Sequence, residues 1–254
     1  MAPALDFPPL LKVWRNRTEL YQQAGALFIE LSKRAISAKG FFTVALSGGA
    51  TPRGLYLSLA NPVIQKQVSW DKIHFFWGDE RFVPKDHPDS NSGWVKKNFF
   101  SKIAVPESNI HPIETDGVSP QEAAMAYEKR LKIFFTGGGF PGFDLVFLGL
   151  GEDGHTASLF PGLPEVEEQV RWVVAPDVKK GEAARITLTL PVFNSADQIV
   201  FLVAGQEKAA VLKAVFDPRK KENYPAGRVQ PIQGSLLFYV DQAAIGQLYG
   251  KNVR

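Results

Sequence analysis

Three short segments of this 254-residue sequence place glycines beside side chains that bind anions or transfer protons. The most specific segment runs from Leu148 to Gly162, with the sequence LGLGEDGHTASLFPG. Neutral imidazole accepts a proton near pH 7 without a large pKa shift, so His155 is a candidate general base. Asp153 or Glu152 could orient that ring and stabilise its cationic form, as a carboxylate does in catalytic triads. The segment therefore predicts acid–base chemistry, with a structural histidine as the alternative.

The segment LSGGATPR, residues 46–53, is suited to hold an anion. Gly48 and Gly49 allow a tight turn that brings backbone N–H groups close to a ligand. A helix that begins after this turn adds free N–H groups and the positive end of its dipole. Ser47 and Thr51 add hydroxyl donors. The G-x-x-x-x-G-K-[ST] pattern of a P-loop is missing, and the alternative is a plain turn between a strand and a helix.

The segment WGDERFVP, residues 77–84, adds charge directly after an apolar run. Asp79 and Glu80 are adjacent carboxylates, and the guanidinium of Arg81 suits a two-pronged contact with phosphate or carboxylate oxygens. A local ion pair on a loop surface is the alternative.

Apolar runs that precede or separate these segments predict the strands. They lie at Phe41–Leu46, Ile73–Trp77, Asp144–Leu150, Trp172–Ala175, Ile186–Leu190, Ile199–Ala204 and Leu236–Val240. Because the runs are continuous and alternate with helices, they predict an α/β fold whose mostly parallel sheet is covered on both faces. Ligands bind beyond the carboxyl ends of strands in such sheets, where all three segments lie. No long polar linker divides the chain, so residues 1–254 are expected to form one domain.

Helix signals separate the strands. Apolar residues recur with helical spacing from Leu20 to Ala35 and stop before Gly40. Ser119, with Pro120 and Glu122, is a helix N-cap with a capping box. Two further helices are expected: one begins around Glu207 and turns Ala210, Val211, Ala214 and Val215 inward, and one follows Asp241 and closes near Gly250.

Composition excludes several classes of protein. The 29 basic and 26 acidic residues are interspersed, so no nucleic-acid partner is expected. With no cysteine, the chain has no disulfide, thiolate nucleophile or zinc–thiolate site. The four histidines lack metal-ligand spacing, so no metal or cofactor is expected. No apolar run approaches the roughly 18 residues of a membrane span, and a soluble cytoplasmic protein is expected.

The segments, in their order along the chain, resemble the glucosamine-6-phosphate isomerase/6-phosphogluconolactonase family. The strongest matches are residues 46–53, 78–84 with Ser90-Asn91, and 144–162; weaker ones are residues 185–194, 205–208 and 225–226. The resemblance implies a three-layer α/β sandwich, shared with the glucosamine-6-phosphate deaminases and ribose-5-phosphate isomerase. It also implies hydrolysis of a small sugar-phosphate lactone, 6-phospho-D-glucono-1,5-lactone, in the pentose phosphate pathway.

The same resemblance implies roles for ten residues. His155 corresponds to the catalytic base, and Asp79 and Asp153 are expected to position the reacting groups. The sugar-phosphate site comprises Ser47, Gly48, Gly49, Thr51, Arg81, Arg185 and Lys208. No cofactor is implied, and the sequence carries no prediction of oligomeric state.

Two departures from the family's usual sequence, and one difference from the deaminases, bear on function. Ala50 and the Ser92-Gly93-Trp94 stretch remove or alter polar groups, and Phe160 stands where the deaminases carry a glutamate. An apolar ring transfers no proton, so Phe160 favours hydrolysis over the alternative, an amino-sugar-phosphate isomerase or deaminase. A second alternative is a non-catalytic sugar-phosphate sensor, which would also carry a helix-turn-helix that the first 40 residues lack.

Overall fold

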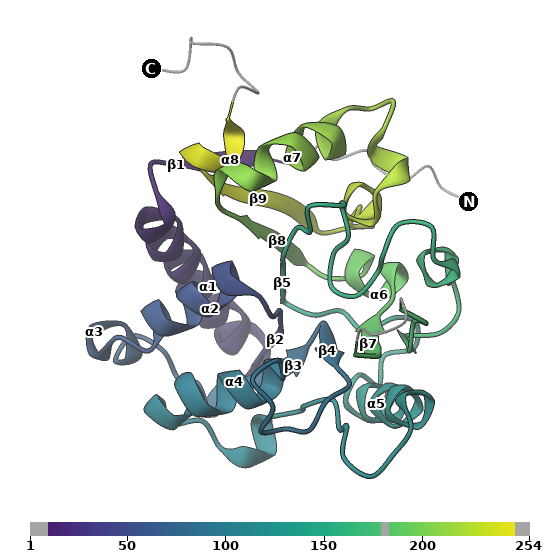
Figure 1. The fold of residues 1–254 in the computed structure, drawn as a ribbon. Coiled ribbons are helices and arrows are strands. Elements are labelled where there is room, and N and C mark those ends of the chain that lie inside the picture. The colour runs from purple at the N-terminus through teal and green to yellow at the C-terminus, as the bar shows by residue number, and fades with distance from the viewer. Residues whose placement is uncertain (1–9, 179–182, 247–254) are drawn as a thin grey trace.

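The computed structural model describes residues 10–178 and 183–246, and its centre is a six-stranded sheet (Figure 1). Neighbouring strands all run parallel, in the order β1-β9-β8-β5-β2-β3. Their bounds are β1 Leu10–Trp14, β2 Phe42–Leu46, β3 Ile73–Trp77, β5 Leu145–Leu148, β8 Gln198–Val203 and β9 Ser235–Asp241. Strands β2, β5 and β8 are buried along their whole length, because helices cover both faces of the sheet.

Alternating side chains on β3 show how helices pack on each face. Phe75 packs beside Trp70 and Phe99 on one face, while Phe76 packs against Phe134 on the other. The helices are α1 Arg17–Lys39, α2 Ala50–Leu59, α3 Pro62–Gln65, α4 Asn91–Asn98, α5 Pro120–Phe134, α6 Leu190–Asn194, α7 Ala209–Phe216 and α8 Gln242–Ile245. The predicted three-layer α/β architecture with a mostly parallel sheet is confirmed.

A second, antiparallel sheet lies beside the first. It has three strands in the order β4-β7-β6, with bounds β4 Asp79–Arg81, β7 Arg185–Leu188 and β6 Val173–Val174. The strands expected near residues 172–175 and 186–190 therefore exist, but they do not extend the parallel sheet. Strand β7 pairs instead with β6 on one side and with β4 on the other. The three residues of β4 are all charged, which is more typical of a loop than of a strand.

Two helix boundaries confirm the sequence signals. Helix α1 ends at Gly40, which takes a left-handed conformation with φ of 88°. Helix α5 begins after Ser119, and the reciprocal hydrogen bonds of a capping box join Ser119 and Glu122.

One other helix prediction needs correction. The helix expected from Glu207 begins as a 3-10 turn, Gln206–Lys208, and α7 starts only at Ala209. Of the side chains expected to turn inward, Val211 and Val215 are buried and Ala214 is partly buried, but Ala210 is exposed. Leu212, which was not expected to face inward, is buried. The last helix, α8, ends at Ile245, and the predicted end near Gly250 lies outside the described residues.

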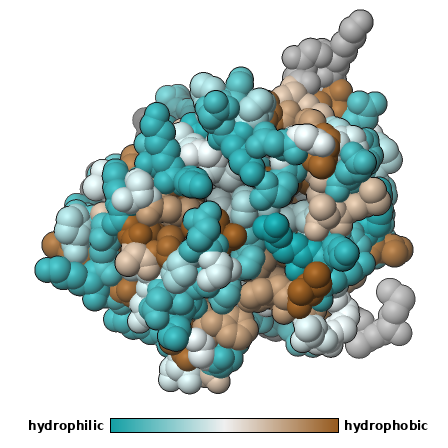
Figure 2. Space-filling model, turned by 90° about the horizontal axis from the view of Figure 1, so that it is seen from below, coloured by the Kyte–Doolittle hydropathy of each residue, from teal (hydrophilic) through white to brown (hydrophobic). Residues whose placement is uncertain are grey.

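The surface is mixed in polarity. On the face in Figure 2, hydrophobic residues form separate patches among hydrophilic ones, while the buried apolar side chains form one continuous core. Among the described residues, the structure contains no helix with the length and apolar composition needed to cross a membrane.

Candidate active site

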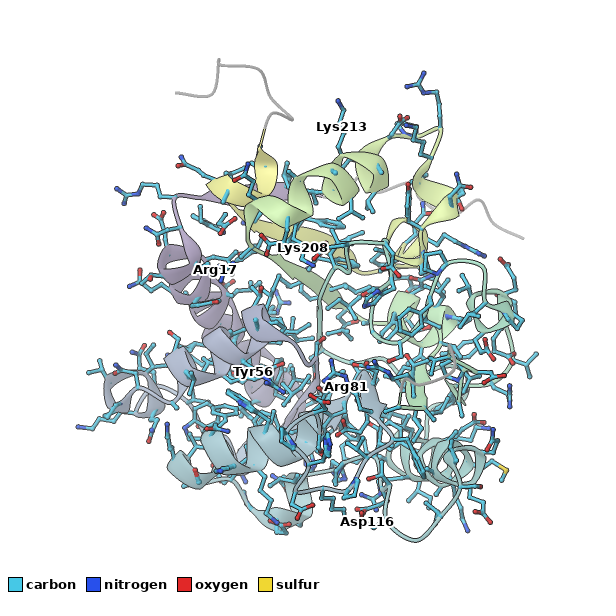
Figure 3. All side chains as sticks on the ribbon, in the orientation of Figure 1. Arg17, Tyr56, Arg81, Asp116, Lys208 and Lys213 are labelled. Atoms are coloured by element: carbon cyan, nitrogen blue, oxygen red, sulfur yellow. The ribbon has the colours of Figure 1, made fainter. Side chains whose placement is uncertain are left out.

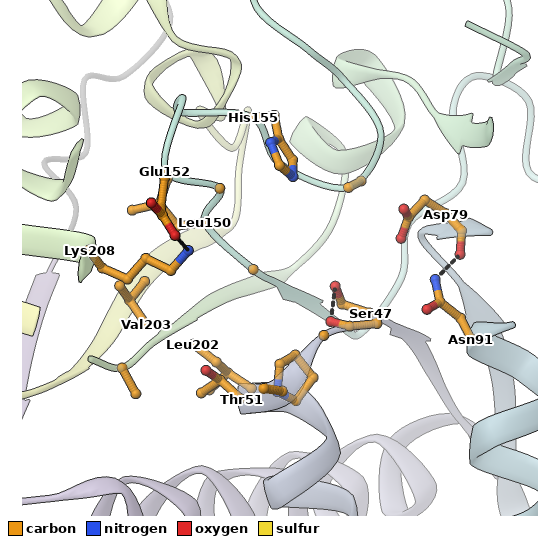
Figure 4. Close-up of a pocket in the computed structure, with 18 of the residues that line it drawn as sticks. Ser47, Thr51, Asp79, Asn91, Leu150, Glu152, His155, Leu202, Val203 and Lys208 are labelled. Carbon is orange, nitrogen blue, oxygen red and sulfur yellow. Dashed lines mark hydrogen bonds and ion pairs between the residues drawn. The ribbon is translucent and has the colours of Figure 1, made fainter. Parts of the chain in front are cut away.

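A pocket of about 670 Å³ opens at the carboxyl ends of the central strands. Its volume lies in the usual range for small-molecule sites. All ten residues predicted to form the site line it, although they come from five separate stretches of the chain. Figure 4 shows Ser47 and Thr51 at its base, His155 above them, and Lys208 and Asp79 on opposite sides. The sheet topology therefore brings the predicted segments together.

The turn after β2 forms the base of this pocket. The backbone N–H and carbonyl of Ser47 both bond to the hydroxyl of Tyr56, at 2.9 Å each. Gly48 packs so closely on the Asn91 side chain that a Cβ would collide with it. Gly49 caps helix α2 without a side-chain hydrogen bond, so the first N–H groups of the helix have no capping side chain. This arrangement suits an anion at the start of α2.

The adjacent carboxylates Asp79 and Glu80 lie on opposite faces of strand β4. Successive side chains of a strand point to opposite faces, so Asp79 and Arg81 line the pocket while Glu80 points away from it. Glu80 accepts hydrogen bonds from the N–H groups of Arg81, Asn91 and Ser92 at 2.7–2.8 Å. Burial raises the pKa of Glu80, and these bonds oppose the rise. Glu80 therefore anchors the start of helix α4 and does not line the pocket, and Ser92 takes part in that anchor.

The His155 ring is held by a carboxylate. Its Nδ1 lies 2.5 Å from Oδ1 of Asp153, and 33% of its side chain is exposed. Burial of Asp153 acts to raise its pKa, but hydrogen bonds and charge from His155 outweigh this and lower the pKa. An ionised Asp153 accepts the Nδ1 proton, which leaves Nε2 as the basic nitrogen. Gly151 permits this contact, because a Cβ there would collide with both side chains.

Of the two acids considered for orienting His155, the structure selects Asp153. Glu152 instead lies 4.0 Å from Nζ of Lys208, at the other side of the pocket (Figure 4). Phe160 lies against the His155 ring, with ring centroids 4.7 Å apart. The partner of His155 is therefore the carboxylate two residues before it.

Cations line the pocket from separate elements. Arg81 and Arg185 are cross-strand partners on β4 and β7, and a guanidinium nitrogen of Arg81 donates to the carbonyl of Asp89 at 2.9 Å. Lys208 comes from the 3-10 turn before α7, and Figure 3 shows it apart from Arg81. The pocket thus offers cationic groups at two places rather than one cluster.

Three further polar residues, Arg17, Asn91 and Glu207, line the pocket without having been assigned site roles from the sequence. Arg17, the first residue of α1, lies 3.9 Å from Glu207 and from Asp241. Asn91 donates from its amide to the backbone carbonyl of Asp79 at 3.1 Å. The match at Ser90-Asn91 was a signal for Asn91, whereas Arg17 had none because strand β1 before it was not predicted. Within the described part of the chain, no three His, Cys, Asp or Glu side chains are grouped to hold a metal ion.

Comparison with known proteins places this pocket in context. Residues 15–238 match the family described as glucosamine-6-phosphate isomerases/6-phosphogluconolactonase. A 6-phosphogluconolactonase of Synechocystis is 42% identical over the full length of both chains. The solved 6-phosphogluconolactonase of Trypanosoma brucei is 26% identical, covers 94% of this chain and 98% of its own, and superposes with a TM-score of 0.82. A monomeric glucosamine-6-phosphate deaminase, 19% identical, covers 92% of this chain and 98% of its own with a TM-score of 0.78, which shows a shared fold.

Proposed function

Because the chain belongs to the glucosamine-6-phosphate isomerase/6-phosphogluconolactonase family, we propose that it hydrolyses 6-phospho-D-glucono-1,5-lactone to 6-phospho-D-gluconate, a step of the oxidative pentose phosphate pathway. The observation that carries the proposal is the His155–Asp153 pair, which shares one pocket with the anion-binding turn at residues 47–51. This pairing of a base with an anion site suits a small substrate that carries a phosphate at one end and a hydrolysable carbonyl group at the other.

In the proposed reaction, His155 acts as the general base. Nε2 removes a proton from water as the water oxygen attacks the lactone carbonyl carbon, C1. The tetrahedral intermediate then breaks the bond between C1 and the ring oxygen, and His155 returns the proton to that oxygen. Asp153 holds the Nδ1 proton and stabilises the imidazolium that forms between these steps. General-base assistance of this kind contributes about 10²–10⁴-fold to the rate.

The phosphate of the substrate is proposed to bind at the turn after β2. The start of α2 supplies N–H groups there, and Ser47 and Thr51 supply hydroxyls. Lys208 and Arg185 add positive charge from two sides of the pocket. Binding at this remote group orients the lactone carbonyl toward His155, so its binding energy is used to lower the barrier.

A lactone-opening assay tests the proposal directly. Freshly prepared lactone is coupled to oxidation of 6-phosphogluconate, and the spontaneous opening rate is subtracted. We expect turnover well above the uncatalysed rate. An activity no higher than that of buffer alone would overturn the proposed function.

The alternative deaminase activity requires proton transfer during opening of a sugar ring. The aromatic ring of Phe160 lies beside His155 and cannot carry a proton. We therefore expect no ammonia release from glucosamine 6-phosphate. Ammonia release at a rate comparable to lactone opening would instead support the deaminase, and tight sugar-phosphate binding without any turnover would support a sensor.

A further inference from the structure

The turn that follows His155 has an unusual backbone. Ala157 has a φ of 49°, the only positive φ of a residue other than glycine in the described part of the chain, and it lines the pocket. An L-residue in this conformation is unfavourable by about 1–2 kcal/mol, so surrounding contacts must hold it. The hydroxyl of Thr156 provides one of them, by donating to the carbonyl of Gly149 at 2.9 Å.

A second side-chain contact is made by Ser158, which does not itself line the pocket. Its hydroxyl donates to Oδ2 of Asp79 at 2.7 Å, and its N–H donates to the hydroxyl of Thr187 at 3.3 Å. Thr187 is itself the cross-strand partner of Asp79 in the β4–β7 pair. Ser158 is fully buried and Asp79 is 5% exposed. Ser158 therefore ties the His155 turn to the strand that carries Asp79, without lining the pocket itself.

The bond from Ser158 occupies only one oxygen of the carboxylate. Among the described residues, none donates to the other oxygen, Oδ1, and Figure 4 shows the carboxylate directed into the pocket. The charged and titratable groups around it are Arg81 and Glu80 on β4, Arg185 on β7, Tyr56 on α2, and His155. Glu80 is engaged by backbone N–H groups and does not line the pocket, so Asp79 is the carboxylate of β4 that a ligand in the pocket can reach.

We propose that Ser158 is a positioning residue that holds Asp79 so that Oδ1 accepts a hydrogen bond from a hydroxyl of the bound sugar lactone. This inference rests on the proposed function and adds a specificity element to it. A site that pairs a buried acceptor with a substrate hydroxyl discriminates strongly against analogues that lack the hydroxyl. Asp79 would then select polyhydroxylated lactones, and the Ser158 hydroxyl would act on specificity through Asp79.

The test uses Ser158→Ala, with Ser32→Ala as its matched control. Ser32 is also buried and donates its hydroxyl to a helix carbonyl, but it lies away from the pocket. We expect Ser158→Ala to lower kcat/KM about 10-fold to 10²-fold, because small errors in positioning carry penalties of that size. Ser158→Cys, which is nearly the same size and a weaker donor, should fall between Ser158→Ala and the unmodified protein. Ser32→Ala should keep full activity.

A double-mutant cycle with Asp79→Ala tests whether Ser158 affects kcat/KM through Asp79. If Ser158 acts through Asp79, Ser158→Ala should change kcat/KM less than about 2-fold in the Asp79→Ala background. An equal effect in both backgrounds would show a structural role and overturn the proposal.

Deoxy lactones test the specificity. The unmodified protein should open one of the 2-, 3- and 4-deoxy analogues of the phosphorylated lactone at least about tenfold less efficiently than the others. Asp79→Ala should abolish that difference and Ser158→Ala should reduce it. Equal efficiency with all three analogues would overturn the inference while leaving the lactonase function intact. Absence of lactone turnover in the unmodified protein would overturn both.

Discussion

The imidazole ring of His155 and those of His74 and His111 lie in opposite surroundings. His155 lines an open pocket and bonds to a carboxylate. His74 and His111 lie with ring nitrogens 3.1 Å apart, and both rings contact Phe134. Burial lowers the pKa of both residues of the pair, to about 4 for His111. Burial therefore disfavours a proton on either ring of the pair, whereas the His155 ring faces a carboxylate.

The difference shows that the neighbours of a histidine decide its chemistry. His155 follows a glycine turn in which Asp153 can reach back to Nδ1, so the imidazolium has a partner of opposite charge. His74 lies within β3, and its closest polar neighbour is another neutral ring. Each prediction below either breaks this contrast or sharpens it.

Replacement of His155 should have the largest effect. His155→Ala removes the proposed base, so kcat should fall about 10²–10⁴-fold. Because the ring is partly exposed, the midpoint of urea unfolding should change little. His111→Gln is the matched control and should retain kcat. Wild-type turnover by His155→Ala would remove the proposed role of His155.

Neutralising the partner of His155 should have a smaller effect. Asp153→Asn keeps an acceptor near Nδ1 but removes the charge that stabilises the imidazolium, so kcat should fall about tenfold or more. The pH–rate profile supplies the decisive measurement. The negative charge beside the ring is then absent at every pH, so the acid limb should shift relative to that of the unmodified protein. An unchanged limb would contradict the pairing.

Replacing a basic side chain of the pocket should weaken substrate binding. Lys208→Ala and Arg185→Ala should each raise KM about tenfold with a smaller change in kcat, because a charge-assisted hydrogen bond to the phosphate is lost. Lys213→Ala is the control, since Lys213 is exposed on α7 and points away from the pocket (Figure 3). An unchanged KM would exclude the replaced residue from the phosphate site.

Much of the site could be predicted because its signals are local. Each segment follows a continuous apolar run, and the parallel topology brings the carboxyl ends of such runs to one edge. Gly48 and Gly151 mark two close approaches of the backbone to side chains. The substrate was not predictable from these patterns, and it entered only through the resemblance to a family.

The missed elements depend on distant contacts. Strand β4 consists of three charged residues, Asp79 to Arg81, and it forms because β7 supplies its partner more than 100 residues later along the chain. Glu80 becomes buried only because the N-terminus of α4 surrounds it with N–H groups. Strand β1 is an edge strand whose exposed and partly buried residues follow no regular alternation. Arg17, which follows β1, was consequently not placed at the pocket.

The smallest expected effect is a loss of stability at low pH that comes from the buried pair, His74 and His111. Histidine in an unfolded chain has a pKa of about 6.5. The lowered pKa values of His74 and His111 mean that the folded protein binds fewer protons than the unfolded chain below that pH. The contribution to stability is therefore complete above about pH 6.5 and is lost as the pH falls toward 4. We expect the pair to account for a loss on the order of 1 kcal/mol between pH 7 and pH 5.

Urea unfolding of His111→Gln at both pH values isolates this contribution. The glutamine amide can replace Nε2 of His111 as the partner of His74 but cannot titrate. The variant should therefore lose less stability on acidification than the unmodified protein. His87→Gln, on an exposed loop, should show the full loss. If His111→Gln and the unmodified protein lost stability equally, burial would not be what separates this pair from His155, and the contrast between the two regions would have to rest on the Asp153 carboxylate alone.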